Sequence, residues 1–363
     1  MSVYRWLVVL VLLFAVLLKG NVKGNKKYVF VAFLLLFCVM ALRDAYSVGN
    51  DSASSYLVEY KEMGKINWED ISGKGTENQN IGFQYLLKAL FVLTKGNYQL
   101  AVVLISAFTM FSYGRFVGKY SPSPVQSILY FFGLLLYTFV LDSLKQSVAM
   151  SILLFSVDAI FDRKLFKFVL LVLFASWFHF PALIFLPAYF IANMKMGRSY
   201  IIVLVLALVL TFLFRDQLLE MMTDAYSTVV YDSGMRFLAN KVIVMIVIVV
   251  AALVLRPPTP EDKIYTGLLQ LIGIAVVLQT FASYNNTFER LADYYFHLSI
   301  VFIPMVFEKC DLQKRYFQPE TDELIKTWAP ILFCGFAIWR FLHYLNGNQF
   351  LTPYLFWFQS TAR

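Results

Sequence analysis

The stretch FVLLVLFASWFHFPALIFLPAYFIANM at residues 168–194 has one side chain that can carry charge near neutral pH, His179. Basic residues flank the stretch on both sides, and they are Arg163, Lys164, Lys167, Lys195 and Arg198. A membrane-spanning helix needs about 20 consecutive apolar residues, and short cytoplasmic loops are rich in Lys and Arg. The stretch therefore predicts two short spans, 164–179 and 180–195, that begin and end on the cytoplasmic side and turn back at His179 outside.

The composition of the whole chain extends this interpretation. Of 363 residues, 60% are hydrophobic and only 15% are charged, whereas soluble domains carry about 25% charged residues. The net charge of +8 does not indicate a nucleic-acid partner, because the basic residues form short clusters between apolar runs. Composition also excludes a disordered chain, a collagen, a coiled coil and a disulfide-rich scaffold. We therefore expect an all-α polytopic membrane protein in which residues 1–363 form one integral membrane domain.

Twelve apolar runs are candidate spans. They cover residues 3–19, 28–43, 98–114, 125–142, 146–161, 164–179, 180–195, 199–215, 240–255, 264–282, 291–307 and 328–345. A shorter apolar segment, 81–94, contains Lys88. The basic clusters between spans all fall on the cytoplasmic side only if this segment does not cross the membrane. We therefore predict about twelve transmembrane helices, a partial or interfacial helix at 81–94, both termini outside, and outer-face loops at 43–80 and 216–239.

Charged residues at the outer ends of the predicted spans are candidates for a functional site, because such charges are costly without a role or a partner. The strongest candidates are Arg43, Lys145 with its neighbour Gln146, His179 and Arg290. Cations grouped on one side of the membrane suit a phosphate or pyrophosphate, which predicts an active cavity on the outer face. Each candidate also has a structural alternative: a helix-end cation, a loop lysine, a capping histidine, or an Arg290 paired with Glu289 or Asp293. Arg340, in the outer third of the last span, is a lesser candidate.

Motifs of soluble enzymes are missing from the sequence. The chain has no P-loop, no dinucleotide-binding glycine pattern, no H-E-x-x-H and no G-x-S-x-G. Asp44 and Asp51 could hold a divalent ion, but no group of residues has metal-ligand spacing. We therefore expect a reaction that uses neither a metal nor a cofactor.

Several of the candidate residues occur in an order that resembles a known family. The order is Arg43, Gly49-Asn50-Asp51 and Tyr56, then Gly82-Phe83, Lys145-Gln146, Trp177-Phe178-His179-Phe180-Pro181, and finally Arg290-x-x-x-Tyr294. Over about residues 28–307 the chain resembles the EpsG family, Wzy-like polymerases of bacterial exopolysaccharide, capsule and O-antigen. It departs from the family where Lys145 replaces the usual Arg, which keeps the charge but loses the planar donor fork. It departs again before Gly82-Phe83, where the family often has an acid; Glu77 is the nearest preceding one.

The resemblance implies a glycosyltransferase at the outer leaflet of the bacterial cytoplasmic membrane. It would transfer an undecaprenyl-pyrophosphate-linked glycan to the non-reducing end of another lipid-linked repeat unit. Cations would stabilise the leaving pyrophosphate, and a base would accept the proton of the acceptor hydroxyl. We expect pyrophosphate and substrate contacts from Arg43, Tyr56, Lys145, Gln146, Arg290, Tyr294 and Arg340. His179 is the first candidate for the base, Asp51 the next and Glu77 a third.

The implied partners are the lipid-linked glycan, the bilayer and, in the same pathway, a chain-length regulator and a flippase, with no nucleic acid. Two other functions remain open at this point. An O-antigen ligase or another lipid-linked-sugar glycosyltransferase would use the same outer-face chemistry with a different acceptor. A flippase or transporter of the lipid-linked glycan would be expected to show repeated halves and polar groups at the bilayer midplane, and neither is evident. A membrane acyltransferase is a weaker third alternative.

Overall fold

The computed structural model describes residues 2–71, 80–217, 220, 240–255, 259, 261–283, 287–308 and 319–359. Within these ranges the chain is 83% helical and forms no strand. The β-type pairing there is an isolated antiparallel bridge between Arg43 and Phe356. The predicted all-α class is confirmed.

The chain divides into two compact units. Unit 1 comprises Met1–Leu154, Trp177–His179 and Thr327–Arg363, and unit 2 comprises Phe155–Ser176 and Phe180–Lys326. Helices α10 (Leu144–Phe161) and α11 (Leu165–Phe178) are shared between the two units. We describe each unit by itself.

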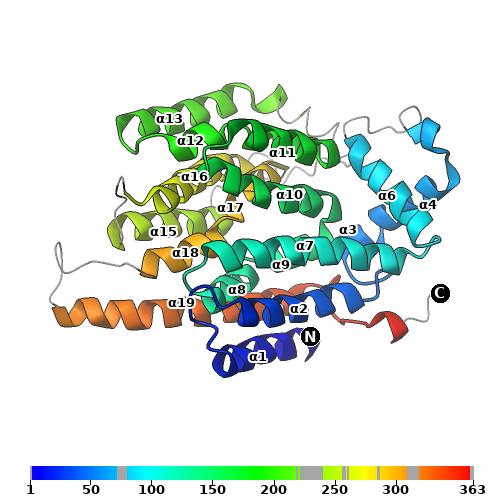
Figure 1. Ribbon diagram of the computed structural model, residues 1–363, viewed down its shortest axis with the longest axis horizontal. Helices are drawn as coiled ribbons and strands as arrows, with labels where there is room; N and C mark the ends of the chain where they lie inside the picture. Colours follow the sequence, from blue (N-terminus) through cyan, green and yellow to red (C-terminus); the bar gives the residue numbers. More distant parts are fainter. Residues whose placement is uncertain are drawn as a thin grey trace. The chain divides into compact units, whose positions relative to one another are not determined.

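Unit 1 is a bundle of apolar helices with two smaller helices after the second. Its further elements are α1 (Ser2–Leu17), α2 (Lys26–Leu42), α3 (Asn50–Ala53), α4 (Ser55–Lys65), η1 (Trp68–Asp70), α6 (Ile81–Leu93), α7 (Tyr98–Tyr120), α8 (Pro124–Gly133), α9 (Leu136–Asp142), most of α19 (Pro319–Gly347) and η5 (Trp357–Gln359). Helix α2 packs along α7 and against α1, and α4 packs against α6 (Figure 1). The predicted outer loop 43–80 thus contains helices.

Local sequence explains where the two central helices of unit 1 begin and why they pack closely. The side chain of Asn25 accepts the backbone N–H of Tyr28 at 3.0 Å, and Asn97 accepts that of Leu100 at 3.2 Å. Asn is a favoured N-cap because its oxygen satisfies such an orphan donor. Gly114 of α7 faces α2, where an added Cβ would lie 3.1 Å from Cγ of Phe33. The glycine therefore permits the close approach of the two helices.

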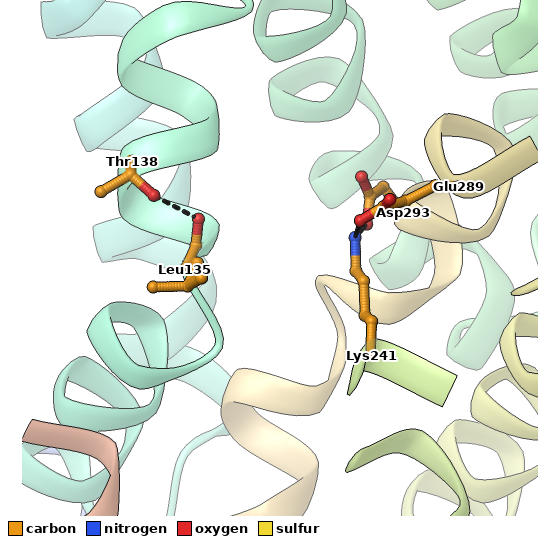
Figure 2. Close-up of polar contacts among 5 residues, drawn as sticks. All are labelled: Leu135, Thr138, Lys241, Glu289 and Asp293. Atoms are coloured by element: carbon orange, nitrogen blue, oxygen red, sulfur yellow. Dashed lines mark hydrogen bonds and ion pairs between the residues drawn. The ribbon is translucent and has the colours of Figure 1, made fainter. Parts of the chain in front are cut away.

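The predicted span 125–142 is two helices rather than one. Helices α8 and α9 meet at 64°, and Leu135 at the junction has a φ of 62°. This left-handed conformation is unfavourable for a residue with a Cβ. The carbonyl of Leu135 accepts the hydroxyl of Thr138 at 2.8 Å (Figure 2). Arg340 of α19 donates to the carbonyl of Gly133, the last residue of α8.

Unit 2 is arranged around one long helix, α16. Its further elements are η3 (Phe180–Phe185), α12 (Ala188–Asn193), α13 (Arg198–Leu213), α15 (Asn240–Leu255), α16 (Lys263–Thr280), η4 (Phe281–Ser283), α17 (Thr287–Phe296) and α18 (Ser299–Glu308). Helix α16 packs against α12, α13, α15 and α17 (Figure 1). The hydroxyl of Tyr200 on α13 donates to the carbonyl of Gln270 on α16 at 2.8 Å. The predicted span 291–307 is also broken, because α17 and α18 meet at 46°.

Every predicted span contains helix, but the predicted span 180–195 consists of the 3₁₀ helix η3 followed by the six-residue α12. Four helices are long and apolar enough to cross a membrane, and the number rises to six if each bent pair counts as one span. The four are Tyr98–Tyr120, Leu144–Phe161, Lys263–Thr280 and Glu323–Gly347. Several others, such as Ser2–Leu17 and Arg198–Leu213, have 16 residues. At 1.5 Å per residue they are about 24 Å long, less than the hydrocarbon core of about 30 Å. The described helices therefore establish four to six candidate spans.

Candidate functional site

Arg43 joins several helix ends in unit 1. It follows the last residue of α2, is fully buried, and donates from Nη1 to the carbonyl of Met40 at 2.7 Å. Its Nη2 donates to the carbonyl of Leu141 near the end of α9 at 2.7 Å, and its Nε donates to that of Val48 at 3.3 Å. Each guanidinium nitrogen therefore bonds to a neutral backbone carbonyl. In this conformation Arg43 connects the ends of α2 and α9, and the pyrophosphate role expected of it stays a prediction.

The segment after Arg43 is tied to α7 and to the C-terminal region. The amide nitrogen of Gln99 on α7 donates to the carbonyls of Ala41 at 2.8 Å and Arg43 at 2.9 Å, and its oxygen accepts the backbone N–H of Ala45 at 2.9 Å. The backbone N–H of Asp44 donates to the carbonyl of Leu355 at 2.8 Å. The end of α2, the start of α7 and the end of α9 therefore lie together.

Asp51 lies close to a second carboxylate, that of Asp142. Oδ1 of Asp142 accepts the backbone N–H of Asp51 at 2.9 Å and that of Ser52 at 3.4 Å, which caps the start of α3. Gly49, just before α3, has a φ of 109°, and an added Cβ would lie 3.1 Å from the same oxygen. Glycine is therefore needed at this turn. Asp51 itself is half-buried.

Lys145 lies between a carboxylate and two aromatic rings. Its side chain is 9% exposed, and Nζ lies 3.6 Å from Oε1 of Glu59. Nζ also lies 5.6 Å from the ring centroid of Phe83 and 6.0 Å from that of Tyr56. Ring faces attract a cation through their quadrupole. The structure therefore brings together Lys145 and Tyr56, both expected in the site, with Phe83 of the Gly-Phe pair.

Glu59 is a site residue that we did not predict. It lies on α4, one turn after Tyr56, and its side chain is 32% exposed. The acid predicted in this neighbourhood was Glu77, which lies outside the described residues. The i, i+3 spacing of Tyr56 and Glu59 was a usable signal, but it indicates a shared helix face only once the segment is known to be helical.

Helix α6 connects the Lys145 region to the turn that contains His179. An added Cβ on Gly82 would lie 2.6 Å from both the carbonyl oxygen and ring atom Cδ2 of Trp177. Tyr85, also on α6, stacks on the ring of Trp177 with centroids 6.0 Å apart, and Trp68 stacks on Tyr85 at 6.2 Å. His179 follows at the end of α11 and is buried. Gln146, beside Lys145 in the first turn of α10, is also buried.

Both ends of α6 and its lysine are held by residues of unit 1. Nζ of Lys88 donates to the carbonyl of Ile66, just after α4, at 2.6 Å. At the other end, the hydroxyls of Thr94 and Tyr60 lie 2.6 Å apart. Burial raises the pKa of Tyr60, and the hydrogen bond with Thr94 opposes this shift. The Tyr60 hydroxyl is therefore protonated near neutral pH.

Unit 2 contains a half-buried lysine, Lys241, which we did not predict. Nζ of Lys241 lies 2.9 Å from Oε1 of Glu289 and also contacts Oδ1 of Asp293 (Figure 2). The side chain of Asp293 is 2% exposed and that of Lys241 16%. Glu289 and Asp293 are one turn apart on α17, so both can reach the same ammonium. Glu289 and Asp293, which the sequence offered as ion-pair partners of Arg290, therefore both bind Lys241.

The other expected site residues lie on α17 and α19. Arg290 and Tyr294 lie on α17 in unit 2, where Arg290 is half-buried and Tyr294 buried. Arg290 is close enough to Asp293 to interact with it electrostatically. Arg340 is half-buried on α19 and bonds to Gly133 at the break between α8 and α9. Unit 1 thus brings Lys145, Tyr56 and Glu59 into one cluster, with Arg340 bonded elsewhere.

Comparison with known proteins gives one family. No curated protein and no solved structure shows significant similarity to the chain. The model of the EpsG family matches residues 26–356, which include most of both units. The match confirms the resemblance seen in the order of Arg43, Lys145, His179 and Arg290. The chain therefore belongs to the EpsG family.

Proposed function

We propose that this protein polymerises undecaprenyl-pyrophosphate-linked repeat units into a surface polysaccharide at the outer leaflet of the cytoplasmic membrane. The match to the EpsG family over residues 26–356 is the observation that carries this proposal, because the family implies a Wzy-like polysaccharide polymerase. Family and apolar helices together indicate a multi-pass membrane protein. The lipid carrier, the leaflet and the direction of transfer are part of the proposal.

The proposal includes about twelve spans, both termini outside, an active cavity on the outer face, and an α6 that does not cross the membrane. In unit 1 the end of α2, the start of α7 and the end of α9 are bonded together around Arg43 and Gln99, as helices alternating across a membrane require. Both ends of α6 contact residues of the predicted outer side, Trp177 at its start and Tyr60 at its end. In unit 2 the start of α15 pairs with the start of α17 through Lys241.

We propose that Lys145 and Gln146 bind the pyrophosphate of the donor. Lys145 is the second residue of α10, where the helix dipole adds partial positive charge that favours an anion. The carboxylate of Glu59 lies 3.6 Å from Nζ of Lys145 and is partly exposed, so it can turn to solvent when an anion enters. Tyr56, Arg290 and Tyr294 are proposed as further substrate contacts from the family pattern.

The reaction forms a bond between the acceptor hydroxyl oxygen and the anomeric carbon of the donor glycan. The bond from that carbon to the pyrophosphate oxygen breaks, and the electron pair leaves with undecaprenyl pyrophosphate, whose charge the cations stabilise. A base takes the hydroxyl proton. We propose His179 for this base, since histidine titrates near neutral pH, with Asp51 as the alternative. We propose positioning roles for Arg43 and Arg340, because both donate to backbone carbonyls.

The glycan itself is proposed to bind the aromatic stack of Trp68, Tyr85 and Trp177. The outer two rings, Trp68 and Trp177, are each 45% exposed. Large rigid rings offer contact area at low entropic cost, and the apolar faces of sugars are complementary to such surfaces. The stack ends two residues before His179, which would bring a bound sugar near the proposed base.

The test is polymerisation by purified, reconstituted protein supplied with lipid-linked repeat units. We expect a ladder of glycan lengths from wild type. Transfer only to a different lipid acceptor would indicate a ligase, and transport without a new glycosidic bond a flippase. In cells, loss of a polymerase leaves single units displayed outside, whereas loss of a flippase leaves them inside. Either alternative result would overturn the proposal.

The base assignment has its own test in the same assay. We expect His179→Ala to abolish most turnover, with and without EDTA, while His343→Ala on the exposed side of α19 leaves it unchanged. Near-normal turnover by His179→Ala would reject His179 and make Asp51→Asn the next variant. Loss of the wild-type reaction in EDTA would reject the metal-free mechanism and point to Asp44 and Asp51.

A further inference from the structure

An apolar groove runs along the surface of unit 1 between α2 and α7. Its volume is about 630 Å³, within the range of about 300–1,000 Å³ typical of small-molecule sites. Gly114 and Gly118, one turn apart on α7, line it. An added Cβ on Gly118 would lie 3.6 Å from Cγ1 of Val29, so this glycine leaves room without being forced by close packing.

One end of the groove is cationic. Lys26, Arg115 and Lys119 line it, and its described lining residues include no carboxylate. Lys26 is the first residue of α2 and Lys119 lies in the last turn of α7. Because the two helices run antiparallel, these cations gather at the same end. The remaining lining side chains, among them Phe37 and Met110, are apolar.

The dimensions fit a lipid of one leaflet. Along α7 the lining extends from Ala107 to Lys119, about 18 Å at 1.5 Å per residue. Half of a hydrocarbon core of about 30 Å is about 15 Å. The positive-inside rule predicts that the cationic end of the groove is cytoplasmic. Arg43 lies at the opposite end of α2.

We infer that this groove binds an anionic phospholipid of the cytoplasmic leaflet. An acyl chain lies in the apolar groove, and Lys26, Arg115 and Lys119 contact the head-group phosphate. Basic pockets between transmembrane helices on the cytoplasmic side are suited to anionic head groups, and lysine and arginine both donate to phosphate oxygens. The site goes beyond the proposed polymerisation and does not depend on it.

The test uses the purified full chain incubated with phosphatidylglycerol or phosphatidylcholine, with bound lipid counted by native mass spectrometry. We expect phosphatidylglycerol to be preferred. The triple variant Lys26→Gln, Arg115→Gln, Lys119→Gln should bind it about tenfold to a hundredfold more weakly, given the effect of each cation near a membrane. The matched triple variant Lys164→Gln, Lys167→Gln, Lys195→Gln removes equal charge from the same predicted side outside the groove and should bind normally.

A second pair of variants tests the acyl chain. Gly118→Leu fills the groove and should lose bound lipid, whereas Gly335→Leu, a helical glycine with open space around it, should retain it. Equal loss by both triple variants, equal binding of the two lipids, or normal binding by Gly118→Leu would overturn the inference. Recovery of a polyprenyl phosphate in place of a phospholipid would also overturn it. If Gly118→Leu does not fold, the triple variants and the lipid preference decide.

Discussion

Lys145 in unit 1 and Lys241 in unit 2 occupy the same position in a helix but have different neighbours. Each is the second residue of its helix, α10 or α15, where the helix dipole disfavours a cation. Lys145 has one partly exposed carboxylate at 3.6 Å and two aromatic rings. Lys241 has two carboxylates, one of them almost fully buried.

The two lysines differ in how closely the surrounding carboxylates hold the ammonium group. Lys145 lies 3.6 Å from the partly exposed carboxylate of Glu59, at a helix start whose dipole favours an anion, so an added phosphate oxygen gains a charge-assisted hydrogen bond. Lys241 is held by two carboxylates, and Arg290 also interacts electrostatically with one of them, so this ammonium group is already paired within unit 2. The lysine is therefore a candidate substrate ligand in one unit and a structural cation in the other, although in the sequence both lie at the start of a predicted span.

The largest expected effect on stability is that of Lys241→Met. It removes the ammonium group that contacts Asp293, whose side chain is 2% exposed, and breaking a buried pair in this way costs about 3–5 kcal/mol. We expect a large loss of folded protein and a lower thermal midpoint in detergent. Lys164→Met, at an ion pair exposed on both sides, should change little. Partial recovery in Lys241→Met with Asp293→Asn would identify the buried charge as the cause; equal stability of the two single variants would contradict the comparison.

Lys145→Met should act on activity instead. Its partner Glu59 is 32% exposed and can be solvated, so folding should be retained. Removing a donor aimed at developing charge costs about 10²–10³ in rate, or about 2.7–4 kcal/mol, and polymer formed per folded molecule measures it. Lys145→Arg should keep substantial activity, since arginine is usual there in the family. Either of two results would contradict the proposed difference between the two lysines. One is a normal glycan ladder from Lys145→Met, and the other is failure of Lys145→Met to fold.

The sequence predicts where the helices lie better than which side chains contact one another. Apolar runs and basic clusters placed helices at all the predicted spans, and the ordered pattern linked Lys145 with Tyr56 before the structure brought them together. Glu59 and Lys241 were missed because their pairing depends on which helices are neighbours. Arg43 bonds to backbone carbonyls, which have no sequence signature. The break at Leu135 was missed because Gly133, at the end of α8, lies within an otherwise continuous apolar run and a lone glycine is tolerated inside a helix.

Arg340→Met should have a moderate effect, on stability rather than activity. It removes a charge-assisted hydrogen bond to the carbonyl of Gly133, which is worth about 1.5–3 kcal/mol. Polymer formed per folded molecule should be unchanged if Arg340 supports the break between α8 and α9. Arg198→Met, exposed at the start of α13, serves as the control. Lost polymer at normal stability would restore Arg340 as a substrate ligand, as first predicted.

The smallest expected effect is at the same break, in Thr138→Val. Valine has the shape of threonine, so the change removes the 2.8 Å hydrogen bond from the hydroxyl to the carbonyl of Leu135 and little else. That carbonyl still accepts the backbone N–H of Phe139 at 3.0 Å, and no buried acceptor is orphaned. We therefore expect about 0.5–1.5 kcal/mol in thermal unfolding.

Thr109→Val gives the matched reference for this last prediction. Thr109 is buried inside the regular helix α7 and donates to the carbonyl of Ile105 at 2.9 Å, so it loses the same bond without a break nearby. If the left-handed Leu135 is held by packing and by Arg340, the two threonine variants should be destabilised equally. A clearly larger loss in Thr138→Val would mean that its hydroxyl fixes the turn between α8 and α9. In that case the Thr138 hydroxyl, and not the ion pair of Lys145 with Glu59, would fix the orientation of α9. That orientation sets the positions of Asp142 and of Lys145 at the start of α10.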